Sequence, residues 1–254
     1  MSEPEAVVHH SAEELVERTA DRVISALAAA VDTNGPAHLV VTGGGILERL
    51  LEALGARGTE VPWRQVHVWW GDERYVPADS DERNDRPAMR LLFDRVDVDP
   101  AKLHRMPAAD AGFGDDVESA ADSYAAELAR AVDGGADGAV PAFDVVLLGV
   151  GPDGHCASLF PGHPGTRVLD TSVIAVHDSP KPPPDRISLT FPTLDAAKEI
   201  WFVASGSGKA DAVARALSGA PREEVPSAGP RGRDHTLWLL DEDAASHLPP
   251  GQAD

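Results

Sequence analysis

Cysteine, basic residues and long apolar runs are scarce in this sequence. A single cysteine, Cys156, stands among 254 residues, which excludes an internal disulfide and fits a reducing compartment. Lys and Arg total 22 against 42 Asp and Glu, so the formal net charge is −20. That charge repels nucleic acid and anionic membranes, although a local cluster of cations can still bind an anionic small molecule.

Targeting signals are also lacking. The first ten residues, MSEPEAVVHH, are acidic where a secretory leader is basic, and no apolar segment of leader length follows. The apolar runs are too short to cross a bilayer. We therefore expect a soluble cytoplasmic protein that is a monomer or weak homodimer, with no nucleic-acid or membrane partner.

Strand and helix patterns alternate along the chain. Ser11, with Glu14 three residues later and apolar residues at helical spacing, predicts a capped helix over 11–32. Further helix patterns lie at 46–54, which Gly55 is expected to end, and at 86–93, 116–132 and 209–219. Strand patterns lie at 37–42, 66–70, 143–148, 186–194, 199–205 and 236–240. This alternation predicts one α/β domain over 1–254, with a mainly parallel, Rossmann-like sheet and helices on both faces.

Glycine-rich or polar sequence follows several of these strands, and ligands of open α/β sheets bind at the carboxyl ends of strands. The first such segment is Thr42-Gly43-Gly44-Gly45, between a strand and a helix. Its glycines let backbone amides approach an anion, and the helix N-terminus adds positive partial charge. Three glycines are more than a turn requires, so we favour a phosphate site over a bare turn. It is not a Walker A loop, because the Gly-Lys-Ser/Thr ending is missing.

The second segment, WWGDERYVP, places charged residues just beyond a strand. Asp72 can supply a base and Arg74 an anion clamp, while a solvated charge run is the alternative interpretation. We expect that alternative for the acids that follow: Asp79, Asp81, Glu82 and Asp85.

The third segment, GVGPDGHCASLFPG at 149–162, fits the pattern G-x-G-x-x-G. A dinucleotide site needs a long helix after the glycines, but Pro161 comes within two turns, so we exclude NAD. Asp153 and His155 remain, and histidine is the side chain best suited to proton transfer near neutrality. We interpret Cys156 as a packing residue, because sequence neighbours in a loop rarely point the same way. The sequence contains neither a serine nucleophile elbow nor His and Cys at metal-binding spacing.

The last signal is a pair of cations. Arg186 opens the apolar run 186–194, and Lys209 opens a helix after VASGSG. Either residue alone would be an ordinary surface cation. Both at strand ends opposite 43–45 would form a phosphate pocket in an otherwise acidic protein.

Together these segments resemble the 6-phosphogluconolactonase family, within the glucosamine-6-phosphate isomerase/6-phosphogluconolactonase superfamily. The matching pieces occur in order from Thr42 to Val213: TGGG, WWGDERYVP with DSDERND, LLGVGPDGHCASLFPG, PPPDRISLT and VASGSGKADAV. The resemblance implies hydrolysis of 6-phospho-D-glucono-1,5-lactone to 6-phosphogluconate, in the oxidative pentose phosphate pathway, without a metal or organic cofactor.

The resemblance also implies roles for individual residues. His155 would be the general base that activates water, and Asp153 would orient or polarise that site. Arg74 would stabilise the oxyanion or the developing carboxylate. Asp72 stands where the isomerase branch has a proton-transferring acid. The residues that would hold the 6-phosphate are Thr42, Gly43, Gly44, Arg186 and Lys209.

Two positions depart from the family pattern. Gly45 replaces a hydroxyl residue of the first loop, so that part of the phosphate cradle must rely on backbone amides. Cys156 replaces the threonine that usually follows the catalytic histidine, which weakens one hydrogen-bonding position near the site.

Two alternative functions remain. An aldose–ketose isomerase or deaminase of the superfamily would carry an Asn-Glu-Pro segment after the Asp-Gly-His core, whereas Ser158 to Pro161 contain no acid. A non-catalytic sugar-phosphate sensor, as in transcription regulators of related fold, would need a DNA-binding module. The first helix has no partner helix before 37, and the net charge opposes DNA.

Overall fold

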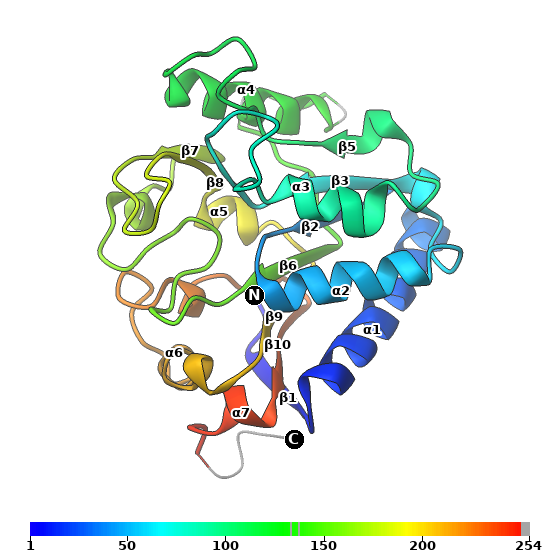
Figure 1. Cartoon of the computed structure of the whole chain (residues 1–254), viewed down its shortest axis with the longest axis vertical. Helices are drawn as coiled ribbons and strands as arrows, with labels where there is room; N and C mark the ends of the chain where they lie inside the picture. The colour runs from blue at the N-terminus through cyan, green and yellow to red at the C-terminus, as the bar shows by residue number, and fades with distance from the viewer. Residues whose placement is uncertain (133, 137, 250–254) are drawn as a thin grey trace.

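A seven-stranded parallel sheet forms the centre of the molecule (Figure 1). The structure is a computed structural model and describes residues 1–132, 134–136 and 138–249. The strand order is β1-β10-β9-β6-β2-β3-β5. These strands are β1 (Pro4–His9), β2 (Ala37–Val41), β3 (Val66–Trp70), β5 (Leu103–His104), β6 (Val145–Gly149), β9 (Glu199–Ala204) and β10 (His235–Asp241).

A smaller antiparallel sheet lies beside the main one, in the order β4-β8-β7. Its strands are β4 (Asp72–Arg74), β7 (Val173–Val176) and β8 (Arg186–Leu189). Gly71 connects the two sheets, because its N–H donates to Val41 of β2 and its carbonyl accepts from Leu189. The small sheet thereby brings β8 next to the carboxyl end of β3.

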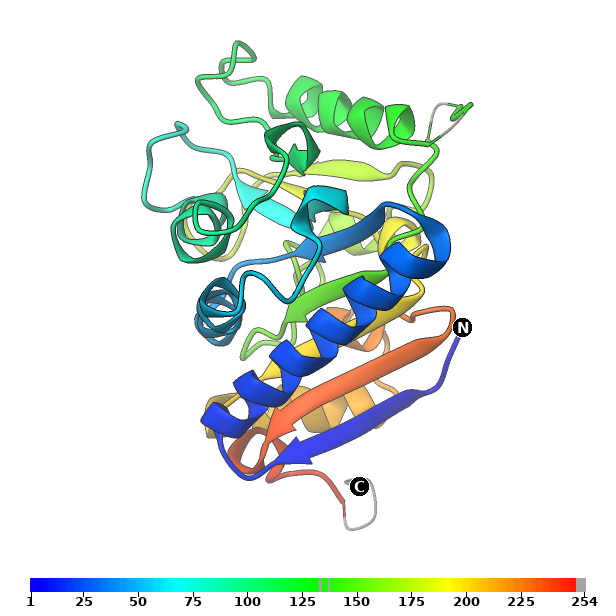
Figure 2. The ribbon, with the colours of Figure 1, turned by 90° about the vertical axis from the view of Figure 1, so that its right-hand side faces the viewer.

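Helices cover both faces of the main sheet, so most residues of the strands between the edge strands β1 and β5 are buried. The helices are α1 (Ala12–Asn34), α2 (Gly45–Ala56), α3 (Asp85–Ala88), α4 (Val117–Arg130), α5 (Phe191–Leu194), α6 (Ala210–Leu217) and α7 (Glu242–Ala245). Figure 2 shows α1 crossing one face of the sheet, and in Figure 1 α5 and α6 lie on the opposite side from α1 and α2. The predicted fold class, an α/β fold with a mainly parallel sheet, is confirmed.

The predicted helix cap is present at α1. The Ser11 hydroxyl accepts a hydrogen bond from the Glu14 N–H at 3.2 Å, and this satisfies one of the free donors of the first turn. Gly35, with φ of +84°, ends the helix in a conformation that favours glycine. No helix among the residues described is long and apolar enough to cross a membrane.

Two expectations about elements were wrong, and a strand near the N-terminus was missed. Gly55 lies inside α2 rather than ending it, because the helix passes so close to the Leu91 carbonyl that a Cβ would overlap it. The stretch 186–194 is strand only as far as Leu189, and Phe191–Leu194 form a helical turn with Pro192 in its first turn. The strand β1 was not expected, because its sequence PEAVVH lacks the apolar alternation of a strand; it lies at the edge of the sheet and is mostly half-buried.

The strand order reverses between β2 and β6. From β2 the chain moves to β3 on one side, whereas from β6 it moves to β9 and β10 on the other. The loops that leave neighbouring strands therefore diverge at this point, which is where open α/β sheets form a crevice. The apolar side chains of both sheets belong to one continuous core. The single domain over 1–254 stays a prediction, since residues 133, 137 and 250–254 lie outside the described part.

Candidate active site

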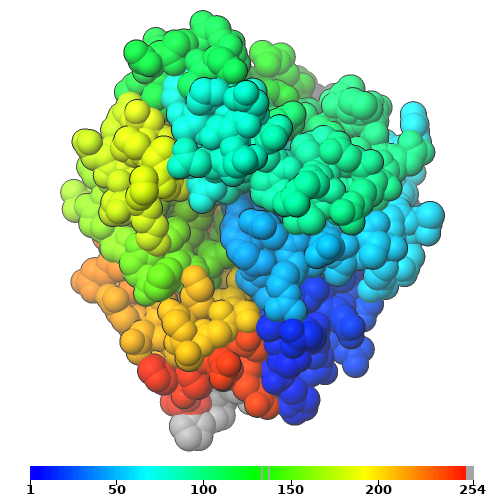
Figure 3. Space-filling model, viewed as in Figure 1, coloured from blue at the N-terminus to red at the C-terminus, as the bar shows by residue number. Residues whose placement is uncertain are grey.

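A cavity of about 530 Å³ opens at the carboxyl ends of β2, β6 and β9. Figure 3 shows this face of the molecule, on which the segments that line the cavity, coloured blue, cyan, yellow-green and yellow, adjoin one another. All but one of the predicted site residues line it: Thr42, Gly43, Gly44, Asp72, Arg74, His155, Arg186 and Lys209. The exception is Asp153, which contacts the His155 ring. The structure thus brings together every residue that the sequence singled out.

His155 and Asp153 form a hydrogen-bonded pair in the loop after β6. Nδ1 of His155 lies 2.5 Å from Oδ1 of Asp153, and the backbone N–H of His155 donates to the same oxygen at 3.4 Å. A carboxylate only accepts, so Nδ1 carries the proton in this contact, and in the neutral ring Nε2 is the nitrogen with the free lone pair. Gly151 makes this arrangement possible, because a Cβ there would overlap both the imidazole ring and the Asp153 carboxylate.

The charge state of Asp153 follows from its neighbours. Burial disfavours the carboxylate, but the hydrogen bond from His155 and the charges of His155 and Lys181 outweigh it and lower the pKa of Asp153. The Lys181 ammonium lies 3.4 Å from Oδ1 of Asp153. Asp153 is therefore a stable anion that can hold the imidazole in one orientation.

Asp72 lies in the wall of the cavity and is 5 % exposed. Its Oδ2 accepts the Ser158 hydroxyl at 2.7 Å, and Asn84 donates to its Oδ1 at 3.4 Å and to its backbone carbonyl at 3.1 Å. Ser158 belongs to the segment in which the isomerase branch would carry its acid. Here that segment supplies a hydroxyl that fixes the Asp72 carboxylate.

Arg74 and Arg186 are paired across β4 and β8. Arg74 donates through one Nη to the Glu82 carbonyl at 2.7 Å, and its buried Nε has no hydrogen-bond partner in the described residues. Both arginines line the cavity, so two guanidinium groups reach it from adjacent strands. Arg186 opens β8, as its place at the start of the run 186–194 predicted, and this strand belongs to the small antiparallel sheet.

Arg186 is buried, and its hydrogen-bond partners are neutral. Its guanidinium donates to the carbonyls of Lys181, Pro182 and Pro183 at 3.1 to 3.2 Å, and it lies over the Phe160 ring at 5.6 Å. Burial lowers the pKa of Arg186. Carbonyl oxygens do not neutralise its charge, which leaves this arginine able to pair with an anion in the cavity.

The glycine loop after β2 contributes backbone rather than side chains. Gly44, with φ of +132°, precedes α2, and the first hydrogen bond of that helix runs from Glu48 to the Gly44 carbonyl. The N–H groups of residues 45–47 therefore have no partner within the helix, and these residues line the cavity. The Thr42 hydroxyl is already engaged, since it donates to the Leu147 carbonyl and accepts from the Gly149 N–H.

Lys209 and Cys156 occupy contrasting places. Lys209 lines the cavity at the start of α6. Burial and the charge of Lys181 lower the pKa of Lys209, and the charge of Asp153 opposes this effect. Cys156 is completely buried, and burial raises the pKa of its thiol. The prediction that Cys156 packs while His155 faces the site agrees with this geometry.

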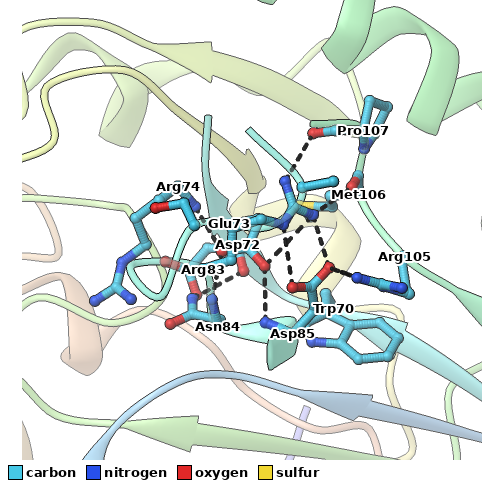
Figure 4. A network of polar contacts seen from close by, with 12 residues as sticks. Trp70, Asp72, Glu73, Arg74, Arg83, Asn84, Asp85, Arg105, Met106 and Pro107 are labelled. Atoms are coloured by element: carbon cyan, nitrogen blue, oxygen red, sulfur yellow. Dashed lines mark hydrogen bonds and ion pairs between the residues drawn. The ribbon is translucent and has the colours of Figure 1, made fainter. Parts of the chain in front are cut away.

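A buried ionic network supports Asp72 and Arg74 from behind (Figure 4). Arg83 makes two hydrogen bonds to Asp85 at 2.8 and 3.1 Å, and Arg105 donates to the same carboxylate at 2.8 Å. Glu73 accepts the backbone N–H groups of residues 74, 84 and 85, while burial raises its pKa to about 7 against the charge of Arg83. In Figure 4 the Arg74 guanidinium points away from this network. The expectation of a solvated charge run is right for residues 79, 81 and 82 and wrong for Asp85, which is fully buried.

Three residues of the site were missed by the sequence analysis: Lys181, Asn84 and Ser158. Asn84 and Ser158 stand inside the DSDERND and ASLFP segments that were already quoted, and polar residues within a motif were the available signal. Lys181 precedes three prolines between β7 and β8, where no local pattern indicates that it reaches the site.

Comparison with known proteins agrees with this geometry. The family model described as glucosamine-6-phosphate isomerases/6-phosphogluconolactonase matches residues 10–238. A 6-phosphogluconolactonase of Streptomyces coelicolor is 50 % identical over 97 % of this chain and 95 % of its own, and one of Mycobacterium tuberculosis is 48 % identical over 92 % and 94 %. The solved 6-phosphogluconolactonase from Trypanosoma cruzi superposes with a TM-score of 0.83 at 28 % identity, over 98 % of both chains. This chain belongs to the glucosamine-6-phosphate isomerase/6-phosphogluconolactonase family.

Proposed function

We propose that this protein hydrolyses 6-phospho-D-glucono-1,5-lactone to 6-phospho-D-gluconate. The observation that carries the proposal is the His155–Asp153 pair at a cavity that also holds two arginines and Lys209, in a chain of net charge −20. The pair supplies a base, and the cations supply a site for a phosphate ester. The names of the relatives at 48 to 50 % identity support the same substrate.

Substrate binding rests on the cations and on the start of α2. The phosphate is held by Arg186, by Lys209 and by the backbone N–H groups of the loop 43–45, in which Gly43 and Gly44 let the anion approach closely. Thr42 supports this loop through its bonds to β6 and is not a direct ligand. The lactone carbonyl then lies toward His155 and Arg74.

The reaction needs one proton to be moved twice. Nε2 of His155 removes a proton from water as its oxygen bonds to the lactone carbonyl carbon, and Asp153 stabilises the imidazolium through Nδ1–H. Arg74 stabilises the negative charge that develops on the carbonyl oxygen. Collapse of the tetrahedral intermediate breaks the bond to the ring oxygen, which takes the proton from Nε2, and the new carboxyl group releases its own proton to solvent to give the gluconate. Asp72, held by Ser158 and Asn84, accepts a hydrogen bond from a sugar hydroxyl.

The isomerase or deaminase activity is the second candidate, and the geometry favours it less. Ring opening would require an acid in the segment after His155. That segment carries Ser158 instead, whose hydroxyl donates to Asp72. A lactone needs only an activated water and an oxyanion site, both of which the cavity can provide.

We further propose that the protein acts in the cytoplasm, as a monomer or weak homodimer, on this small-molecule lactone. The net charge of −20 opposes binding to nucleic acid or anionic membrane, and the single cysteine fits a reducing compartment. Sedimentation at two protein concentrations separates monomer from dimer.

The proposal is tested with lactone generated freshly from glucose 6-phosphate, because the lactone also hydrolyses spontaneously. Formation of 6-phosphogluconate is followed with a coupled dehydrogenase, with and without the protein. We expect a rate far above the uncatalysed background and no release of ammonia from glucosamine 6-phosphate. A rate equal to the background, or ammonia release at a comparable rate, would contradict it.

A further inference from the structure

Lys181 reaches the catalytic pair from a different part of the chain. It lies in the segment between β7 and β8, and its Nζ is 3.1 Å from Nδ1 of His155 and 3.4 Å from Oδ1 of Asp153. We propose that Lys181 is a positioning residue that fixes the tautomer of His155 and keeps its imidazole neutral in the resting enzyme. This inference rests on the proposed function of the His155–Asp153 pair.

Hydrogen-bond chemistry determines what Lys181 can do there. An ammonium group only donates and a carboxylate only accepts, so Asp153 is the one partner that both Lys181 and the His155 ring can share. With Nδ1–H directed at Asp153, the ammonium also donates to that oxygen. Nε2 is then the unprotonated nitrogen, as water activation requires. Without Lys181, the Asp153 carboxylate would keep only its two hydrogen bonds from His155 and would be held less firmly.

The charge of Lys181 acts in a second way. Asp153 alone favours an imidazolium, because a carboxylate at 2.5 Å stabilises the positive ring. The ammonium at 3.1 Å opposes that effect. The charges of Lys181 and Asp153 therefore largely cancel at the His155 ring. The ring keeps Asp153 as its orienting partner without being held in the protonated state.

The backbone of Lys181 is held by a residue of the phosphate site. Arg186 donates to the Lys181 carbonyl at 3.1 Å, and the Ser179 hydroxyl donates to the same carbonyl at 2.9 Å. At the end of this segment His177 contacts Asp185 and Glu118 of α4, at 2.7 and 2.8 Å. The lysine thus stands on a segment fixed at both ends.

Other charged groups face the same cavity, and they differ from Lys181 in their contacts. Lys209, Arg74, Arg186 and Asp72 line it, but none of them has a hydrogen bond or ion pair with Asp153 or His155 among the residues described. Lys181 is the cation that directly touches the pair. Its side chain is 39 % exposed, so it can be replaced without opening a cavity in the core.

The test compares Lys181→Met, which removes the charge, with Lys181→Arg, which keeps it, and with Lys102→Met as a control on a half-buried lysine outside the site. The activity is kcat/KM for fresh lactone between pH 5 and 9. In Lys181→Met we expect kcat to fall about tenfold or more with KM within about twofold, and the acidic limb of the profile to move up by about one pH unit. Lys181→Arg should return the limb to the wild-type position.

A readout independent of turnover keeps this inference separate from the proposed function. The imidazole nitrogens of His155 are followed by NMR during a pH titration, with His155→Gln to assign them. Lys181→Met should raise the midpoint of that titration and mix the two neutral tautomers. An unchanged titration, or a KM that rises more than tenfold at constant kcat, would overturn the inference and make Lys181 a substrate ligand. Failure of the wild type to hydrolyse the lactone would instead reject the proposed function.

Discussion

Gly151 lies against the imidazole of His155, at a place where a Cβ would overlap Nδ1 of the ring and Oδ1 of Asp153. The glycine is thus a steric requirement of the His155–Asp153 pair, although it carries no functional group. Its N–H also donates to the His155 carbonyl at 2.8 Å, which closes the loop around the pair.

Replacement of Gly151 by alanine should therefore displace the His155 ring without unfolding the protein. We expect kcat/KM for the lactone to fall at least about 100-fold, because a misplaced base loses its alignment with the attacking water. Gly208→Ala is the matched control, since a Cβ at 208 meets no atom within 4 Å. Equal activity of the two variants would show that the ring has room to move.

The buried network of Figure 4 should contribute strongly to stability. Arg83 is 2 % exposed and lies between Asp85 and Glu73, so Arg83→Leu leaves two carboxylates in the interior without their main counter-charge. Removal of one partner from such a pair typically costs about 3–5 kcal/mol.

Urea unfolding measures this loss directly. The control is Arg64→Leu, which breaks the exposed pair with Asp97 and should change the unfolding free energy by less than about 1 kcal/mol. Similar losses in the two variants would mean that the network is neutral in its net effect.

Cys156 should be inert toward thiol reagents in the folded protein. Its side chain is fully buried, and burial raises the pKa of the thiol, so the reactive thiolate is suppressed. Iodoacetamide at pH 8 should leave the native protein unlabelled and fully active, and should label it only in denaturant. Labelling that abolishes activity in the native state would assign Cys156 to the active site.

A ladder of histidines on β2, β3 and β5 should make the protein sensitive to acid. The rings of His38 and His67 stack at 4.8 Å, and those of His67 and His104 at 5.2 Å. Burial lowers the pKa of His38 and of His67 to about 4, with further lowering by neighbouring histidines. The unfolded chain then binds more protons than the folded one between about pH 6.5 and 4, so stability rises with pH across this window.

After allowance for solvent screening, this effect amounts to about 2 kcal/mol of unfolding free energy lost between pH 7 and pH 5. His67→Gln should remove about half of that loss. His247→Gln, which replaces an exposed histidine, should leave the slope unchanged. A slope that is the same in all three proteins would place the acid sensitivity elsewhere.

The sequence was sufficient to predict those site residues that follow a recognisable strand, because the strand pattern and the topology of a parallel sheet together give their position. Loops after parallel strands must meet at one edge of the sheet, so Thr42, Asp72 and His155 could be placed together before the structure was known. The orienting role of Asp153 toward His155 was an expectation from the family resemblance of the segment GPDGH, and the two side chains do lie in contact.

Contacts that depend on the path of a loop could not be predicted in this way. Lys181 is 26 residues from His155 in sequence, and its approach is set by the segment between β7 and β8. Asp85 reads as part of a charge run, because its neighbouring partner Arg83 belongs to the same run and its second partner, Arg105, lies 20 residues away. Burial of a charge is a property of the tertiary fold, and the composition of a short segment does not determine it.

The most direct test of the mechanism is kcat/KM for fresh 6-phosphogluconolactone in wild type and His155→Gln, corrected for spontaneous hydrolysis. Glutamine keeps a polar side chain of similar length but cannot accept a proton from water. We predict a loss of at least about 1,000-fold with the thermal unfolding midpoint within a few degrees of wild type. A His155→Gln protein that hydrolyses the lactone at the wild-type rate would contradict the assignment of His155 as the base.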